Sequence, residues 1–136
     1  MQMWFSQYHT VNVKLDVRIQ EQLFSGQSDY QKIDEIPFDY TRKRMSVVVK
    51  NNKNNGYRMF TKGALEEVLK TCTKVKYDGK IVDITDEMIK IVEEKAKEFA
   101  SKGMQVISLA SKREYRGVNV FSVEDEKDMT FIGFVA

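Results

Sequence analysis

Two strand-like segments joined by an asparagine-rich turn constrain the fold of this 136-residue chain more than any other feature. The first, residues 44–50, contains three consecutive valines, a β-branched run typical of a strand buried on both faces. Residues 51–56 are rich in Asn and end in Gly, and both residue types accept positive φ, so they predict a turn. Residues 57–61 then predict a returning strand. The chain therefore contains a β-hairpin.

The segments around this hairpin mix strands and helices without regular alternation. Val11 to Phe24 predicts an amphipathic helix that stops at Gly26. Further strands are expected at residues 30–38, 74–77, 81–84, 104–111 and 129–135, and further helices at residues 65–72 and from Thr85 to about Lys102. This mixture predicts an α+β fold, with helices packed against an antiparallel or mixed sheet. The length, and the lack of a repeat or linker, predict a single domain over residues 1–136.

Several kinds of site are excluded by the residue types present. The chain has one cysteine, Cys72, and one histidine, His9, which cannot form an internal disulfide or a His/Cys zinc site. We expect Cys72 to be a small buried hydrophobic residue. The closest glycines, Gly56 and Gly63, are seven residues apart, so neither common glycine-rich phosphate loop can be written. No apolar run reaches the length of a membrane span and no signal peptide is evident, which predicts a soluble intracellular domain.

The charge is unevenly distributed. Seven of the 22 basic residues, and none of the 20 acidic ones, lie between Thr41 and Leu65. This segment is the positive pole of an otherwise acidic protein and would attract phosphates. The simpler alternative is a solvated strand edge protected by lysines. The acidic run Glu124-Asp125-Glu126 is expected to be a solvated face.

Two motifs carry a resemblance to a known family. Residues 34–49 read Asp-Glu-Ile-Pro-Phe-Asp-Tyr-Thr-Arg-Lys-Arg-Met-Ser-Val-Val-Val, and Lys62-Gly63-Ala64 follows on the next strand. Together they resemble the nucleotide-binding domain of P-type ATPases. Leu65, where other branches usually have proline, makes the chain most similar to bacterial magnesium-transporting members. The resemblance continues through residues 103–110 and 131–136, so it covers nearly the whole chain.

The first motif implies a nucleotide pocket. Phe38 matches the aromatic residue on which the family stacks adenine, and the preceding proline would hold its ring out as a flat apolar platform. Without the motif, a core phenylalanine would be the simpler interpretation. Lys43 matches the lysine that faces the nucleotide. Arg42 and Arg44 would add positive field for the phosphates, although a solvated edge remains open for each of them.

Further residues of the implied pocket come from three other segments. Lys62 matches a lysine that lines the pocket, and Gly63 a glycine that lets the backbone lie against the base; a plain strand-to-helix corner is the alternative. Asp16 matches an acid that hydrogen-bonds the adenine amino group. Gln105 stands where the family commonly has an arginine that reaches the phosphates, which should weaken that contact by about 1 kcal/mol.

The resemblance implies an excised domain of a larger transporter. The family's phosphorylated aspartate motif, Asp-Lys-Thr-Gly-Thr, is absent, so no catalytic residue is assigned and no metal site is expected. The domain would bind ATP, as Mg-ATP, and present the γ-phosphate to a separate phosphorylation domain. Its partners would be the phosphorylation, actuator and membrane domains of a plasma-membrane cation transporter, with this part cytoplasmic and monomeric. Stacking plus a few lysines predicts a dissociation constant between about 1 mM and high micromolar.

Two alternatives belong to other function classes. Basic residues beside Phe38, Tyr40, Tyr57 and Phe60 could form a nucleic-acid-binding surface, although the acidic remainder would repel a long polyanion. A degenerate domain, which keeps the fold without binding nucleotide, is the other alternative.

Overall fold

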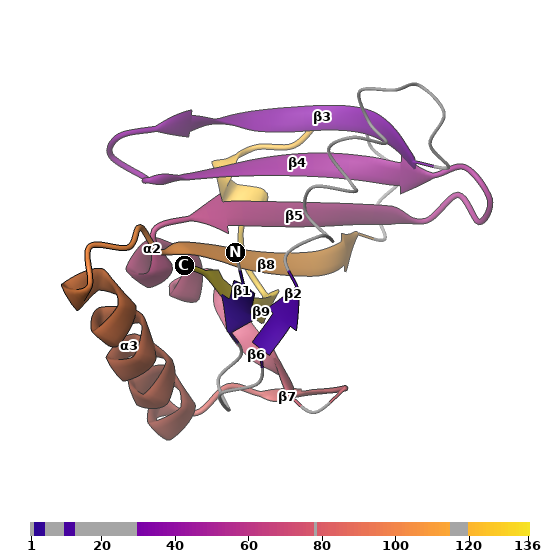
Figure 1. Ribbon diagram of the computed structural model, residues 1–136. Helices are drawn as coiled ribbons and strands as arrows, with labels where there is room; N and C mark the ends of the chain where they lie inside the picture. The colour runs from indigo at the N-terminus through magenta and orange to yellow at the C-terminus, as the bar shows by residue number, and fades with distance from the viewer. Residues whose placement is uncertain (1, 5–9, 13–29, 78, 115–119) are drawn as a thin grey trace.

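A computed structural model of the chain describes residues 2–4, 10–12, 30–77, 79–114 and 120–136. Its strands join in one mixed sheet with the order β2-β1-β9-β8-β5-β4-β3, and β6 pairs with both β7 and β9 (Figure 1). The strands are β1 (Gln2–Trp4), β2 (Thr10–Asn12), β3 (Tyr30–Asp39), β4 (Arg44–Asn51), β5 (Tyr57–Gly63), β6 (Cys72–Tyr77), β7 (Lys80–Asp83), β8 (Ile107–Glu114) and β9 (Met129–Val135). The α+β class is confirmed.

Strand β9 makes the sheet mixed. It runs antiparallel to β8 along most of its length and antiparallel to β1 near its end. Its first half is parallel to β6. The remaining described pairs are antiparallel, including the expected hairpin of β4 and β5. Since β3 pairs with the other side of β4, the valine-rich strand is internal, and the lysine-protected edge expected as an alternative for this segment is wrong.

The helices in the described part of the chain are α2 (Leu65–Leu69), α3 (Asp86–Ser101) and the short 3-10 helix η1 (Val123–Asp125). The Thr85 side chain accepts a hydrogen bond from the Met88 backbone and caps α3, as expected. Gly103, with φ of +80°, follows its end. Figure 1 shows both α-helices at the end of the sheet where β5 leads into α2.

Several boundaries differ from the sequence prediction, and strand pairing explains three of the differences. Val11, expected to begin a helix, lies in β2, where it pairs with β1; the rest of that helix falls outside the described residues. Helix α2 ends at Leu69 because Cys72 already pairs with Met129, while the Thr71 hydroxyl donates to the Val68 carbonyl. Strand β8 begins three residues later than expected and extends to Glu114, since β5 supplies partners from Ser108 to Glu114.

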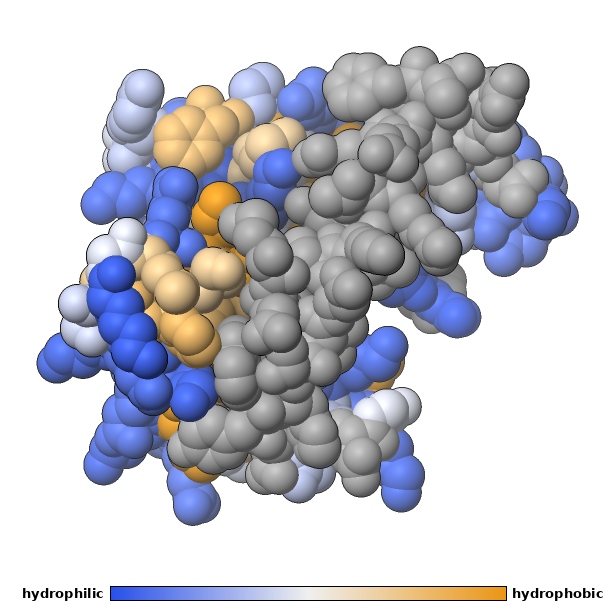
Figure 2. Space-filling model, in the orientation of Figure 1, coloured by the Kyte–Doolittle hydropathy of each residue, from blue (hydrophilic) through white to orange (hydrophobic). Residues whose placement is uncertain are grey.

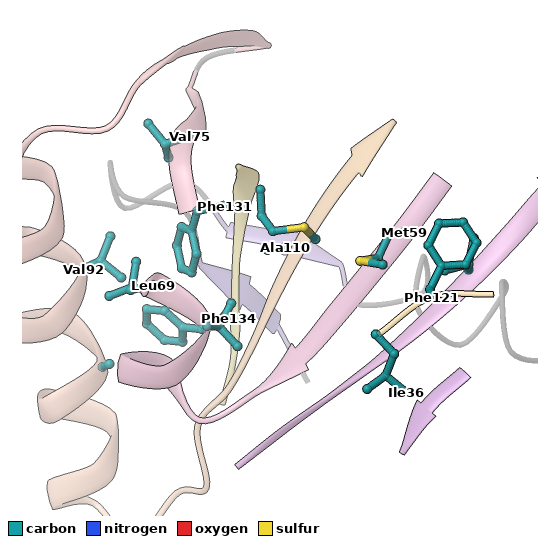
Figure 3. Packing of buried hydrophobic residues seen from close by; sticks show 13 residues of the cluster. Ile36, Met59, Leu69, Val75, Val92, Ala110, Phe121, Phe131 and Phe134 are labelled. Carbon is teal, nitrogen blue, oxygen red and sulfur yellow. The ribbon is translucent and has the colours of Figure 1, made fainter. Parts of the chain in front are cut away.

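The core lies between the sheet and the helices. Figure 3 shows Leu69 of α2 and Val92 of α3 close to Phe131 and Phe134 of β9. A second part of the same cluster joins Ile36, Met59 and Phe121. Successive valines of β4, at 48 and 49, are both almost fully buried, which confirms burial on both faces.

The pleat of the sheet separates two rows of side chains that bear on function. Met45, Lys62 and Leu109 are register partners on β4, β5 and β8 and share one face. Their neighbours Ser46, Thr61 and Ala110 share the other. Among the described residues, no helix is both long and apolar enough to cross a lipid bilayer.

Candidate functional site

A pocket of about 490 Å³ opens where the β3–β4 turn, the end of β5 and the segment before β8 meet. Its size lies in the range usual for small-molecule sites. It is lined by Phe38, Tyr40, Lys43, Met45, Lys62, Gly63, Ala64, Gln105, Val106 and Ile107. Figure 2 shows hydrophobic side chains gathered near this end of the sheet, at the upper left of the view, among hydrophilic ones. Five of the eight residues named from the sequence therefore lie together: Phe38, Lys43, Lys62, Gly63 and Gln105.

Phe38 presents an open aromatic face to this pocket. Its side chain is 51% exposed, so it is not the core phenylalanine of the simpler interpretation. The ring packs edge-on against Tyr40, with ring centroids 5.5 Å apart and planes at 85°. The regular pairing of β3 with β4 is interrupted between Ile36 and Asp39, around Pro37, which has no N–H to donate to a strand ladder. This irregularity sets Phe38 apart from Ile36, which is buried in the core.

Two lysines supply the charge of the pocket. Lys43 sits in the β3–β4 turn with φ of 53°, and its backbone N–H donates to the Asp39 carbonyl at 2.7 Å. Lys62 projects from β5 on the face of Met45. In the part of the chain that the structure describes, no carboxylate forms an ion pair with either ammonium group. Both charges therefore remain available to an anionic ligand.

Gly63 allows two backbone segments of the pocket wall to lie in close contact. A Cβ built there would lie 2.3 Å from the Lys43 carbonyl oxygen and 2.7 Å from the Arg44 Cα, distances that no side chain tolerates. The next residue, Ala64, donates its N–H to the same Lys43 carbonyl at 3.0 Å. Glycine is thus required here by the approach of another stretch of backbone, whether or not a ligand base also lies against it.

Arg42 and Arg44 face a different partner. Their Nε atoms donate to the same oxygen of Glu126, at 2.8 and 3.2 Å. Arg42 also donates to Asp39 and to the carbonyls of Pro37 and Arg44. Both guanidinium groups are largely buried, and neither residue lines the pocket of about 490 Å³. Their role at the site is to hold the turn that carries Lys43.

Glu126 corrects the expectation that the acidic run is solvated. Its neighbour Glu124 is exposed, whereas the Glu126 side chain has no exposed surface. Its second oxygen accepts from the Ser46 hydroxyl, which in turn lies 2.6 Å from the Thr61 hydroxyl. A buried carboxylate is tolerated because two guanidinium groups and a hydroxyl satisfy it. We call Arg42, Arg44, Ser46 and Glu126 the buried ion cluster.

Asp39 stabilises the same turn from its exposed side. The backbone N–H of Arg42 donates to its carboxylate, and this hydrogen bond, together with the Arg42 guanidinium, holds the pKa of Asp39 below its ordinary value. The turn residues 39–44 are therefore fixed by Asp39 at one side and Glu126 at the other.

Other named residues lie elsewhere. Asp16 and His9 fall outside the described residues. Cys72 is half-buried, and burial raises the pKa of its thiol to about 11, so it is protonated at neutral pH, as expected of a structural cysteine. Sequence reasoning did not assign Tyr40, Met45 or Val106 to the pocket. Strand alternation could have placed Met45 beside Lys62, because the hairpin register fixes that pair.

A second hollow of about 510 Å³ adjoins the pocket and shares Lys43, Ala64 and Val106 with it. Three glutamates line this hollow, Glu66, Glu67 and Glu93. Lys43 and Lys97 line it too, so the hollow keeps a small excess of negative charge, whereas the lining of the first pocket carries two lysines and no acidic residue.

Comparisons with known proteins identify the family of this chain. The sequence pattern of the family described as P-type ATPase, cytoplasmic domain N, matches residues 9–136. The chain is 33% identical to a magnesium-transporting ATPase, P-type 1, of Escherichia coli over 98% of its own length. It is 38% identical to a protein of the same name in Salmonella typhimurium over 79% of the chain, and 34% identical to a calcium-transporting ATPase 1 of Bacillus cereus over 82%.

The chain spans only a small part of these relatives: 16% of the Escherichia coli protein, 12% of the Salmonella protein and 13% of the Bacillus protein. The similarities confirm the resemblance inferred from residues 34–49 and 62–65, including its leaning towards magnesium-transporting members.

Proposed function

Because this chain belongs to the family of P-type ATPase cytoplasmic N domains, we propose that it binds ATP in the pocket of Phe38, Lys43 and Lys62 and presents the γ-phosphate to another domain of a cation transporter. The transported cation would be Mg²⁺, as it is for the magnesium-transporting relatives from Escherichia coli and Salmonella typhimurium. The observation that carries the proposal is one pocket that holds an exposed aromatic ring and two lysines, neither of which forms an ion pair with another described residue.

The chemistry of the lining residues supports an adenine nucleotide. A purine stacked on Phe38 would meet apolar surface from Met45 and Ile107 on other sides of the pocket. The Lys43 and Lys62 ammonium groups would attract the phosphates. Gln105, exposed at the pocket wall, offers an amide in place of a charged group.

The contribution of these residues to phosphoryl transfer is positioning. A nucleotide held at its base leaves its terminal phosphate free to meet a reacting group on a separate domain. Mg²⁺ would arrive with the phosphates and neutralise part of their charge. Weak binding, of about −4 to −6 kcal/mol, suits a domain that must release ADP in each cycle.

The test is an NMR titration of the chain with ATP, AMP and GTP. Saturable amide shifts at Phe38, Lys43 and Gly63 with ATP and AMP are expected. Phe38→Ala should weaken binding about 5- to 150-fold, because base stacking on an aromatic ring contributes roughly 1–3 kcal/mol. Ile81→Ala is the matched control, since Ile81 is a large exposed hydrophobic residue of β7 that does not line the pocket.

Two further outcomes discriminate the alternatives. The double substitution Lys43→Gln and Lys62→Gln should weaken the binding of ATP more than that of adenosine, because adenosine has no phosphates for the lysines to attract. No saturable shift at several millimolar ATP would reject nucleotide capture by this chain and favour a degenerate domain. The family membership leaves no support for a nucleic-acid module, and residues 57 and 60 lie on opposite faces of β5, so its aromatic residues form no single stacking platform.

A further inference from the structure

A small polar pocket at the other end of β5 gathers hydrogen-bond donors. Its volume is about 250 Å³, and it forms where the β4–β5 turn meets β8. It is lined by Arg58, Arg113, Asn51, Asn54, Gly56, Tyr30 and Tyr57. No acidic residue is among those that line this pocket. Its lining therefore carries positive charge without internal compensation.

The two arginines form a like-charged pair. Arg58 on β5 is the direct register partner of Arg113 on β8, so both side chains leave the same face of the sheet. The Arg58 guanidinium donates one hydrogen bond, to the Ser111 hydroxyl at 3.3 Å. Over the residues that the structure describes, neither guanidinium meets a carboxylate. Like charges directly opposite each other destabilise a sheet, and a bound anion would remove that cost.

The two asparagines add neutral donors. The Asn51 side-chain oxygen accepts from the Lys53 backbone N–H at 2.9 Å, and that of Asn54 accepts from the Gly56 N–H at 2.8 Å. These backbone donors fix which end of each amide is the oxygen. Since the turn uses both oxygens, each amide has its NH₂ group to offer to a ligand. The pocket thus combines two guanidinium forks with two amide donors.

We propose that this pocket binds a phosphate-type oxyanion. A guanidinium fork matches two oxygens of such a group, and tetrahedral oxyanions accept several donors at once. The pocket is separate from the Lys62 pocket: Lys62 lies four positions along β5 from Arg58, a span of about 13 Å at the usual rise of a strand. The anion is either free phosphate or the phosphate tail of a nucleotide held at Phe38.

The test is a titration of the whole 136-residue chain with inorganic phosphate, at constant ionic strength and with chloride as the balancing anion, followed by NMR. We expect saturable shifts at the Arg58 and Arg113 side chains and at Gly56. Arg58→Gln combined with Arg113→Gln should weaken phosphate binding tenfold or more. The melting temperature of this double variant should not fall, because the substitutions remove a like-charged pair. A loss of phosphate binding could then not be attributed to unfolding.

The matched control is Lys50→Gln combined with Lys53→Gln, which removes the same charge nearby from residues that do not line the pocket. The proposal would be overturned if this control weakened phosphate binding as much as the arginine variant does. It would also be overturned if the shifts rose linearly with phosphate and chloride produced equal shifts, because the surface would then attract anions only through its general positive charge. Phosphate shifts confined to Lys43 and Lys62 would overturn it too. Shifts at Arg58 with ATP that vanish in Phe38→Ala, while those with inorganic phosphate persist, would identify the nucleotide tail as one source of the anion.

Discussion

Gly63 is the residue whose identity the structure constrains most tightly. The carbonyl of Lys43 occupies the position that a side chain would need, and the hydrogen bond from Ala64 fixes that carbonyl in place. The neighbour in the way is backbone of an internal strand's turn, which cannot move aside as a flexible side chain would. Because Gly63 has no side chain, the turn that carries Lys43 can approach the end of β5, which carries Lys62, this closely.

Gly63→Ala should lower stability by about 1–3 kcal/mol, the usual cost of inserting a group into packed structure. It should also weaken ATP binding, because Lys43 must shift. Gly56→Ala is the matched control: the atom that a Cβ would meet there is the Asn54 side-chain oxygen, which can rotate away. Thermal melts of both variants check the first expectation and ATP titrations the second. Equal melting temperatures would show that the turn yields without strain.

At the scale of elements, α3 shows how far local signals reach. Thr85 followed by Asp86 and Glu87 predicts a helix start, and the structure confirms both the cap and the stop at Gly103. The helix packs through Val92 and Ala96, as its apolar spacing predicts. The ends of α2 and β8 differ from the sequence prediction. Pairing of Cys72 with β9 ends α2, and pairing with β5 sets the length of β8, and neither pairing has a local sequence signal.

Thr85→Ala should destabilise the domain by about 0.5–2 kcal/mol, since the Met88 N–H loses its side-chain acceptor. The expected readout is a fall of a few degrees in melting temperature. Thr85→Asp should restore most of the loss, because aspartate caps equally well and favours the helix dipole. Failure of that rescue would mean that Thr85 acts through something other than the cap.

At the scale of the whole molecule, the segment 120–127 fastens to three strands of the sheet. The Phe121 N–H donates to Asp34 of β3 at 2.7 Å, and Lys112 of β8 donates to the Asp125 carbonyl. Glu126 joins the segment to β4 through the buried ion cluster. This segment thus supports the turn that carries Lys43, through Glu126 and its two arginines.

Glu126→Ala should therefore cost about 3–5 kcal/mol, the usual effect of leaving buried charges without their partner. Glu126→Gln should cost less, because it keeps an acceptor for Arg42. Both should weaken ATP binding to the remaining folded protein, since the turn 39–44 loses its inner support. Denaturant unfolding measures the first effect. Glu124→Gln removes the same charge from an exposed position of the same run and should change little; an equal loss there would contradict the cluster's role.

The sequence by itself determined the order of strands and helices from residue 30 onward, the central hairpin, the family and five residues of the candidate pocket. Each follows from neighbouring residues, through β-branched runs, turn residues, caps and two short motifs. The tertiary structure alone decided that Arg42 and Arg44 pair with Glu126, more than 80 residues away, and that Gly63 is required by a crossing backbone. It also placed Arg58 opposite Arg113. Such pairings depend on sheet register between distant segments, where the charge of one residue says nothing about which partner the fold brings to it.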